Sequence, residues 1–302
     1  MKPKILIAGS SGLVGVALRA ALEARGFDVA GLDIQAVGAD AGDVRDIDDV
    51  RRAMMGCDGV VHLAAVSRVV WGERDPDLCE ATNVGGLRNL IEVLSSEDKS
   101  PWLIFASSRE VYGQPQTLPV TEDAPLRPMN VYGNSKAVGE QMVASAVNRG
   151  IRATTVRLSN VYGSTGDHAD RVIPAFTRGA VLGEQLRVDG ADNTFDFTHI
   201  DDTVRGLVLL VDHKMRGGDG FPPIHFVTGQ STTLQQLAEM AIDIAGTDAE
   251  IRHAPARTYD VATFCGDPTR ARELLGWSSQ VTLREGLSRL IDDFRDELHQ
   301  PD

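Results

Sequence analysis

Residues 4–15 read KILIAGSSGLVG, an apolar run followed at once by Gly9, Gly12 and Gly15 in the spacing G-x-x-G-x-x-G. The run predicts a short buried strand, and the apolar spacing over 13–25 predicts a helix directly after the glycines. Glycine suits such a turn because a side chain would keep a pyrophosphate from the backbone amides or push the helix off the sheet. The amino end of the helix adds unpaired N–H groups and partial positive charge. This stretch therefore predicts a dinucleotide site.

An acidic residue follows the glycine turn at the spacing that a dinucleotide site requires. Asp33 ends the second strand-like run, FDVAGLDI at 27–34. A carboxylate there accepts hydrogen bonds from the ribose hydroxyls of adenosine and repels a 2′-phosphate, so the sequence favours NAD over NADP. A phosphate-binding P-loop is disfavoured, because no Gly-Lys-Ser or Gly-Lys-Thr follows the glycines.

Strand-like and helix-like segments alternate through the first half of the chain. Further strands are predicted at 59–65, 102–107 and 151–158, with helices at 46–55, 76–94 and 131–148. This rhythm is typical of βαβ units and predicts an α/β fold with a doubly wound parallel sheet, the Rossmann type.

The rhythm loosens beyond about residue 164, where Pro174 and later prolines break the pattern. Helices remain readable at 201–211, 233–245 and 283–295. We therefore expect an NAD-binding domain over 1–163, completed by interleaved later segments. A smaller, partly interleaved C-terminal lobe over 164–302 is expected to bind the substrate.

Composition excludes several classes of protein. The chain has 302 residues with a formal net charge of −13, which argues against binding nucleic acid or anionic membranes. No apolar run approaches the ~20 residues of a membrane helix, and the first residues lack the apolar region of a signal peptide. Three scattered cysteines and seven histidines without HExxH spacing predict reduced thiols, no metal and a cytoplasmic location.

A tyrosine and a lysine stand four residues apart in NVYGNSK at 130–136. Tyr132 and Lys136 share one face of the predicted helix, and a nearby ammonium lowers the pKa of a phenol from about 10. Such a phenol can take or return a hydroxyl proton near neutral pH. Ser107 and Ser108 end a buried strand, at the sheet edge where ligands bind, so a serine hydroxyl there can polarise a substrate oxygen.

Together these motifs resemble the extended short-chain dehydrogenase/reductases of the nucleotide-sugar epimerase/dehydratase type. The resemblance covers nearly the whole chain and is specific for the family more than for the reaction. The matching stretches, in family order, are AGSSGLVG, Asp33, GDVRD at 42–46, HLAA at 62–65, TNVGG at 82–86, SSREVYG at 107–113, VYGNSK, RLSNVYG at 157–163, FTHIDD at 197–202 and RARELLGW at 270–277.

The resemblance implies an NAD site and a catalytic set. Tyr132 would be the acid/base and Ser108 its hydrogen-bonding helper, while hydride leaves a sugar carbon, usually C4, for NAD. The cofactor residues would be Gly9, Gly12, Leu13, Val14 and Gly15 at the pyrophosphate, Asp33 at the adenosine ribose, Asp43 and Val44 beside adenine, Leu63, Ala64 and Ala65 along the cofactor, and Lys136 at the nicotinamide ribose.

The favoured activity is that of an NAD-dependent nucleotide-sugar epimerase, similar to UDP-sugar 4-epimerases, in which hydride returns to the opposite face of a keto-sugar. Glu110 keeps an alternative open, because dehydratases and decarboxylases of the family carry an acid two residues beyond the Ser/Thr; a salt-bridged structural role is equally open. A 4-keto reductase ranks third, since Asp33 disfavours NADPH. A non-catalytic NAD sensor is the alternative of another class.

The substrate side departs from the family pattern. Phe195 stands in T-F-D-F where members commonly carry an arginine that holds the nucleotide's diphosphate. Asn160 and Arg257 match the remaining phosphate-binding positions, and Arg171, Arg178 or Arg187 could replace the missing arginine. A nucleotide-diphosphate sugar remains the expected substrate. The resemblance also implies a homodimer that pairs through the helices predicted at 76–94 and 131–148.

Overall fold

The computed structural model describes residues 2–97, 100–259 and 261–299, and the chain forms two compact units. The first unit comprises Met1–Gly113, Glu122–Leu158 and Val204–His225. The second comprises Gln114–Thr121, Ser159–Thr203 and Phe226–Asp302. Each unit is therefore assembled from segments that lie far apart in the sequence.

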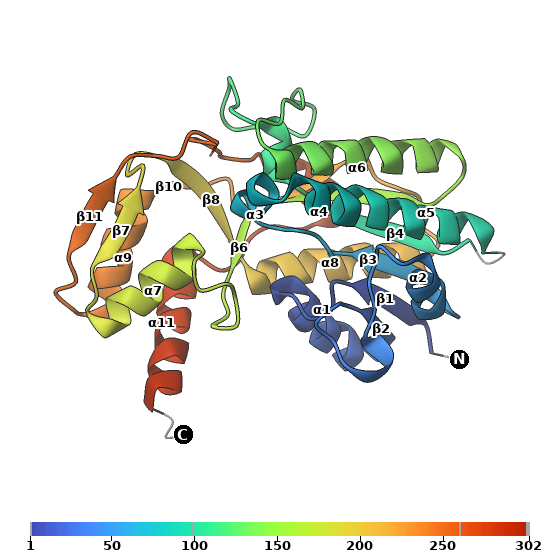
Figure 1. The fold of residues 1–302 in the computed structure, drawn as a ribbon, viewed down its shortest axis with the longest axis horizontal. Helices are drawn as coiled ribbons and strands as arrows, with labels where there is room; N and C mark the ends of the chain where they lie inside the picture. The colour runs from blue at the N-terminus through green and yellow to red at the C-terminus, as the bar shows by residue number, and fades with distance from the viewer. Residues whose placement is uncertain (1, 98–99, 260, 300–302) are drawn as a thin grey trace. The chain divides into compact units, whose positions relative to one another are not determined.

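A six-stranded sheet forms the centre of the first unit, in the order β2-β1-β3-β4-β5-β9 (Figure 1). Neighbouring strands from β2 to β5 pair in parallel. Strands β3 and β4 are buried along their whole length, as expected for a parallel sheet with helices on both faces. The strands are β1 (Lys4–Ala8), β2 (Asp28–Leu32), β3 (Gly59–His62), β4 (Trp102–Ser108), β5 (Ala153–Leu158) and β9 (Ile224–Phe226).

Helices cover both faces of this sheet, which confirms the predicted doubly wound α/β fold (Figure 1). On one face, apolar side chains such as Val50, Leu87 and Val143 form the core with the strands. The helices of that face are α2 (Ile47–Met54), α5 (Gly86–Ser96) and α6 (Val131–Asn148), and those of the opposite face are α1 (Leu13–Ala24) and α8 (Ile200–Met215). Short 3-10 turns lie at η1 (Gly38–Asp40) and η3 (Arg109–Tyr112).

The chain is helical throughout the segment predicted as one helix over 76–94, but one turn of that helix is of π type. After α3 (Val69–Arg74) and α4 (Pro76–Glu80), a turn of π-helix spans Ala81–Gly85 and leads into α5. Periodicity alone does not show such a turn, which adds one residue to the helical repeat. The turn carries the buried Asn83, whose amide donates to Ser135 Oγ at 2.8 Å and accepts from the N–H of Val66 at 2.8 Å. Asn83 thereby connects the segment after β3 to helix α6.

The second unit contains two small sheets, ordered β10-β8-β6 and β11-β7. Its core joins apolar side chains of β7 and β8 to those of three helices. The strands are β6 (Asn160–Tyr162), β7 (Leu186–Asp189), β8 (Thr194–His199), β10 (Ser231–Thr233) and β11 (Ile251–Ala254). The helices are α7 (Val172–Leu182), α9 (Leu234–Ala245), α10 (Thr269–Leu275) and α11 (Leu283–His299).

Pro174 does not break the structure, contrary to the sequence prediction. It lies in the first turn of α7, which begins at Val172. Backbone N–H groups in a first turn have no acceptor within the helix, so a proline there removes no hydrogen bond. The predicted pattern break is therefore the start of a helix.

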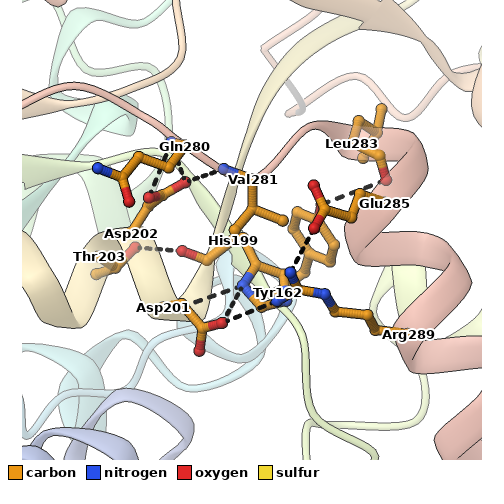
Figure 2. A network of polar contacts seen from close by, with 10 residues as sticks. All are labelled: Tyr162, His199, Asp201, Asp202, Thr203, Gln280, Val281, Leu283, Glu285 and Arg289. Carbon is orange, nitrogen blue, oxygen red and sulfur yellow. Dashed lines mark hydrogen bonds and ion pairs between the residues drawn. The ribbon is translucent and has the colours of Figure 1, made fainter.

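Buried carboxylates hold the irregular segments of the second unit. Asp202 is 1% exposed and accepts hydrogen bonds from the N–H groups of Gln280, at 2.9 and 3.0 Å, and Val281, at 3.0 Å (Figure 2). Asp196 is also buried and accepts from the N–H of Thr228 at 2.9 Å. These bonds join segments that are distant in the sequence. Within the described parts of both units, no helix has the length and apolar character needed to cross a membrane.

Candidate active site

The glycine turn follows β1, at the point where the strand order of the sheet changes direction between β1 and β3. Gly9 has a φ of +92°, and a Cβ on it would lie 2.5 Å from the backbone nitrogen of Ala64. A Cβ on Gly15 would lie 2.1 Å from the carbonyl oxygen of Gly9. The chain's own packing therefore requires both glycines, and ligands of open α/β sheets bind at such a point.

Gly12 is not required by packing in the same way. Its φ is −75°, and a Cβ on it would meet one atom of the described structure within 4 Å, the carbonyl oxygen of Gly9 at an ordinary 3.6 Å. Gly12 caps α1 without a side-chain hydrogen bond, and the first turn, with Leu13 and Val14, carries no acidic residue. An amino end left open in this way binds anions, and glycine lets a phosphate approach the backbone closely. The turn fits a dinucleotide.

Asp33 lies beside this turn. Its carboxylate accepts hydrogen bonds from the N–H of Ser11 at 3.0 Å and from the N–H of Gln35 at 2.8 Å. Each carboxylate oxygen retains a lone pair for a further donor. The backbone thus holds the carboxylate next to the glycine turn, where a ribose bound with its phosphates on α1 can reach it.

The two residues predicted beside adenine, Asp43 and Val44, differ from each other in their surroundings. Asp43 accepts a hydrogen bond from Arg45 Nε at 2.8 Å, and this bond lowers the pKa of Asp43 although burial opposes it. Val44 is buried in the core, where its Cγ2 would lie 2.7 Å from a Cβ on Gly86. The side chain of Val44 therefore serves packing.

The segment predicted to run along the cofactor follows β3 directly. Leu63, Ala64 and Ala65 are half-buried. The N–H groups of Leu63 and Ala64 both donate to the carbonyl oxygen of Ala8, at 2.7 and 2.8 Å. The backbone of this segment is thereby fixed to the end of β1, immediately beside the glycine turn.

Tyr132 and Lys136 come together in a buried position at the amino end of α6. Asn130 caps the helix, and both Tyr132 and Lys136 are buried, the latter 4% exposed. Lys136 Nζ donates to the carbonyl oxygen of Ala106 at 2.8 Å and lies 5.9 Å from the centroid of the Tyr132 ring. Burial lowers the pKa of Lys136 to about 8. An ammonium in this position stabilises a phenolate on Tyr132.

Two glycines let α6 approach the end of β4. A Cβ on Gly133 would lie 2.6 Å from the carbonyl oxygen of Glu110, and one on Gly139 would lie 2.6 Å from Phe105 Cζ. Because neither neighbour leaves room for a side chain, the helix packs directly on the strand and on the turn that follows it. This contact positions the Tyr–Lys pair at the strand end that carries Ser108.

Ser108 and Glu110 are both buried at that strand end. Ser108 Oγ accepts from the N–H of Glu110 at 3.2 Å and caps the short turn η3. The carboxylate of Glu110 is engaged at both oxygens, by Arg109 Nη2 at 2.9 Å and by Asn130 Nδ2 at 2.8 Å. Glu110 thus belongs to a local ion pair and hydrogen bond.

The sequence analysis missed a buried acid on the same helix. Glu140 follows Lys136 by four residues and accepts hydrogen bonds from Ser107 and Arg157. Its signal in the sequence is the four-residue repeat of Tyr132, Lys136 and Glu140, which places all three on one stripe of the helix.

Two of the predicted substrate residues, Asn160 and Arg257, lie in the second unit, whereas Ser108 ends β4 in the first. Asn160 is half-buried, with its amide nitrogen 3.4 Å from the carbonyl oxygen of Asp196. Arg257 is exposed and lies 5.8 Å from the ring of Tyr259. Phe195, which stands at the position of the family's arginine, is buried in the core of this unit.

The three candidate replacement arginines have separate surroundings. Arg171 pairs with Asp167 at 3.2 Å, and Arg187 pairs with Asp189 at 2.8 Å. Arg178 lies exposed on α7. Two of the three cations are therefore already paired within the chain.

A doubly wound sheet, a glycine turn at its switch point and a buried Tyr–Lys pair at a strand end define a dinucleotide-dependent enzyme. The model of the NAD dependent epimerase/dehydratase family matches residues 5–226, and the chain belongs to this family. The resemblance in the sequence is thereby confirmed, and NAD is the cofactor, as in several matching crystal structures that contain NAD.

Similar proteins include enzymes of more than one reaction. A UDP-glucose 4-epimerase of Corynebacterium glutamicum is 29% identical, over 96% of this chain and 94% of its own. A dTDP-glucose 4,6-dehydratase of Streptomyces griseus is 31% identical, over 80% of this chain and 73% of its own. The crystal structure of UDP-glucose 4-epimerase from Thermotoga maritima with UDP-glucose superposes with a TM-score of 0.90 at 28% identity, over 98% of this chain and 100% of that chain.

Proposed function

We propose that this protein is a UDP-sugar 4-epimerase in which the first unit binds NAD and the second binds the sugar nucleotide. The observation that carries the proposal is the buried pair of Lys136 and Tyr132, in which Lys136 is bonded to Ala106 on the strand that ends in Ser108, at the carboxyl edge of the sheet. The glycine turn opens at this same edge. The similarity to UDP-glucose 4-epimerases over nearly the full length supports the choice of substrate.

Each residue has a defined task in this reaction. The Tyr132 phenolate accepts the proton of the sugar's C4 hydroxyl, and the Lys136 ammonium stabilises that phenolate. The Ser108 hydroxyl bonds the same sugar oxygen and orients it. Bound NAD would supply the hydride acceptor and donor for the C4 carbon. After the keto-sugar has turned over, Tyr132 gives its proton back, so the reaction needs no net oxidant.

A 4,6-dehydratase or a decarboxylase is the second candidate, and Glu110 is the residue that would serve it. The family includes such enzymes. However, both oxygens of Glu110 are engaged, by Arg109 and by Asn130. Elimination of water needs an acid or base that is free to exchange a proton with the substrate. The paired state of Glu110 therefore favours epimerisation.

Incubation with a panel of nucleotide sugars tests the proposal. Purified protein without added cofactor would be mixed with UDP-, dTDP-, GDP- and CDP-sugars, and products would be followed by NMR and mass spectrometry. We expect two stereoisomers of equal mass to interconvert, with UDP-sugars turned over fastest. Heat-denatured protein should release NAD.

The other outcomes separate the alternatives. A product lighter by one water identifies a dehydratase, and one lighter by carbon dioxide identifies a decarboxylase. Bound NAD without turnover of any sugar would favour the non-catalytic sensor. The matched control is Glu110→Gln, which should retain epimerisation in the main proposal and lose the reaction in the second candidate.

We also propose a homodimer in the cytoplasm. Leu78 on α4 and Val147 on α6 are 39% and 42% exposed, and these helices are the expected pairing elements. The three free cysteines suit a reducing compartment. Light scattering on the purified protein measures the mass directly, and charged substitutions at Leu78 and Val147 together should yield monomers.

A further inference from the structure

Strands β4 and β5 present two polar side chains to the same point on helix α6. Ser107 and Arg157 are register partners in the parallel pair β4–β5, so their side chains leave the same face of the sheet. Both meet the carboxylate of Glu140. Ser107 Oγ donates to Glu140 Oε1 at 2.6 Å, and Arg157 donates from Nε to Oε1 at 2.9 Å and from Nη2 to Oε2 at 2.7 Å.

The junction formed by Ser107, Glu140 and Arg157 is buried, and further hydrogen bonds hold Arg157 in place. Ser107, Glu140 and Arg157 are all buried, and Arg157 Nη1 also donates to the carbonyl oxygen of Glu122 at 2.7 Å and to Tyr112 Oη. Burial alone would lower the pKa of Arg157, but its hydrogen bonds to Glu140 raise it. The guanidinium is therefore a fixed cation that holds the carboxylate in one orientation.

The junction lies one helical turn from the proposed catalytic pair. Tyr132, Lys136 and Glu140 recur at four-residue intervals on one stripe of α6. On the strand side, Ser107 immediately precedes Ser108. A displacement of α6 along β4 would therefore move the Tyr–Lys pair away from the serine hydroxyl.

We propose that Glu140 is a positioning residue: its bonds to Ser107 and Arg157 fix helix α6 in register with the end of β4. This inference rests on the proposed function, because it assigns Glu140 a task in that site. Glu140 touches neither substrate nor cofactor and acts through the placement of Tyr132 and Lys136. Displacements of about 1 Å cost about a hundredfold in rate when the catalytic geometry is tight.

Glu140 also acts on the charge of Lys136. Burial lowers the pKa of Lys136, while the Cys79 and Glu140 side chains oppose that effect. From β3, His62 faces the same ammonium and is kept neutral by its burial. Removal of the Glu140 charge would leave Arg157 unpaired and lower the pKa of Lys136 further. The ammonium would then be lost at a lower pH.

The first test is Glu140→Gln, compared with wild type as NAD-loaded, folded protein. We expect kcat to fall about tenfold or more with KM nearly unchanged. The alkaline limb of the pH–kcat profile should move to lower pH by about half a unit or more. A folded Glu140→Gln protein with wild-type kcat and an unmoved alkaline limb would overturn the proposal.

The second test is Ser107→Ala, which keeps the ion pair between Glu140 and Arg157 and therefore disturbs the buried charges less than Glu140→Gln does. We expect kcat to fall about threefold, less than in Glu140→Gln, because the ion pair still holds the carboxylate and only part of the positioning is lost, with the alkaline limb unchanged. Thr177→Val is the matched control, because it removes a buried hydroxyl that bonds the carbonyl oxygen of Ile173 in the second unit. An unchanged kcat in Ser107→Ala, equal to that of Thr177→Val, overturns the positioning role.

The product formed by the wild-type protein tests the proposed function, whereas the two variants test the positioning role of Glu140. If wild-type protein forms a dehydrated or decarboxylated product, the epimerase proposal fails, and the same kcat and pH comparison on that product still decides the role of Glu140. If wild type turns over normally and both variants match it, only the positioning inference fails.

Discussion

The two units bury polar groups in different ways. In the first unit, buried charged side chains such as Lys136, Glu140 and Arg157 face one another or the sheet edge where the proposed reaction occurs. In the second unit, the buried carboxylates Asp196 and Asp202 accept hydrogen bonds from backbone N–H groups of irregular segments. Substitutions in the first unit should therefore change rates most, and those in the second should change stability most.

The largest expected effect falls on the proposed acid/base. Tyr132→Phe removes the phenol and leaves the aromatic ring, so turnover should fall at least about a thousandfold while NAD remains bound. Product formation by NMR and NAD content by absorbance after denaturation measure the two quantities. Retention of wild-type activity would remove Tyr132 from the reaction.

A stability effect of about 3 kcal/mol is expected in the second unit. Asp202→Ala leaves the N–H groups of Gln280 and Val281 without their buried acceptor. Asp201→Ala is the control, because that carboxylate is 63% exposed and its pair with Arg289 should contribute less than about 1 kcal/mol. Urea unfolding measures both, and equal losses would contradict the contrast between a buried and an exposed acid.

Between pH 7 and pH 5, the buried His62 is expected to lower the free energy of unfolding by about 2 kcal/mol. Burial lowers the pKa of His62 from 6.5 to about 3, so the folded protein binds no proton there while the unfolded chain does. The free energy of unfolding therefore falls by about 1.4 kcal/mol for each pH unit below 6.5. His62→Phe, which preserves the stacking on Phe105, should lose less stability between pH 7 and pH 5. If wild type and His62→Phe lost stability equally as the pH falls, His62 would not be the source of the loss.

The smallest expected effect is a loss of NAD affinity at Gly12, which a comparison with Gly15 in the same turn separates from a loss of stability. Gly12→Ala should fold normally, because its Cβ meets only the Gly9 oxygen at 3.6 Å among the described residues, yet bind NAD about tenfold more weakly. Gly15→Ala should destabilise the fold itself, since its Cβ would lie 2.1 Å from that oxygen. Calorimetric titration with NAD and thermal unfolding distinguish the two. Unchanged NAD affinity in Gly12→Ala would argue against phosphate contact at this turn.

Much of the first unit could be predicted from the sequence, because its strands and helices alternate with clear periodicity. The strand before Gly9 and the helix that carries Tyr132 occur with the predicted bounds. The π turn in the predicted 76–94 helix could not be seen, because Asn83 is held by Val66 and Ser135, which are distant in the sequence. Periodicity reports local structure only.

The second unit was less predictable for a related physical reason. Its short strands owe their stability to partners far along the chain, such as β11, which pairs with β7. Pro174 shows that one residue type can signal either the end or the start of a helix, and only the tertiary structure decides between them. The Glu140 junction was missed because its partners, Ser107 and Arg157, come from two strands.

The hydrogen bonds of Asp33 have a consequence for cofactor engineering. Replacement of this acid by a neutral residue would remove the charge that repels a 2′-phosphate on the ribose. Here the same carboxylate secures the backbone of Ser11 and of Gln35. A redesign would therefore also need a side chain that restores these two anchors, and serine or asparagine is a better starting replacement than alanine.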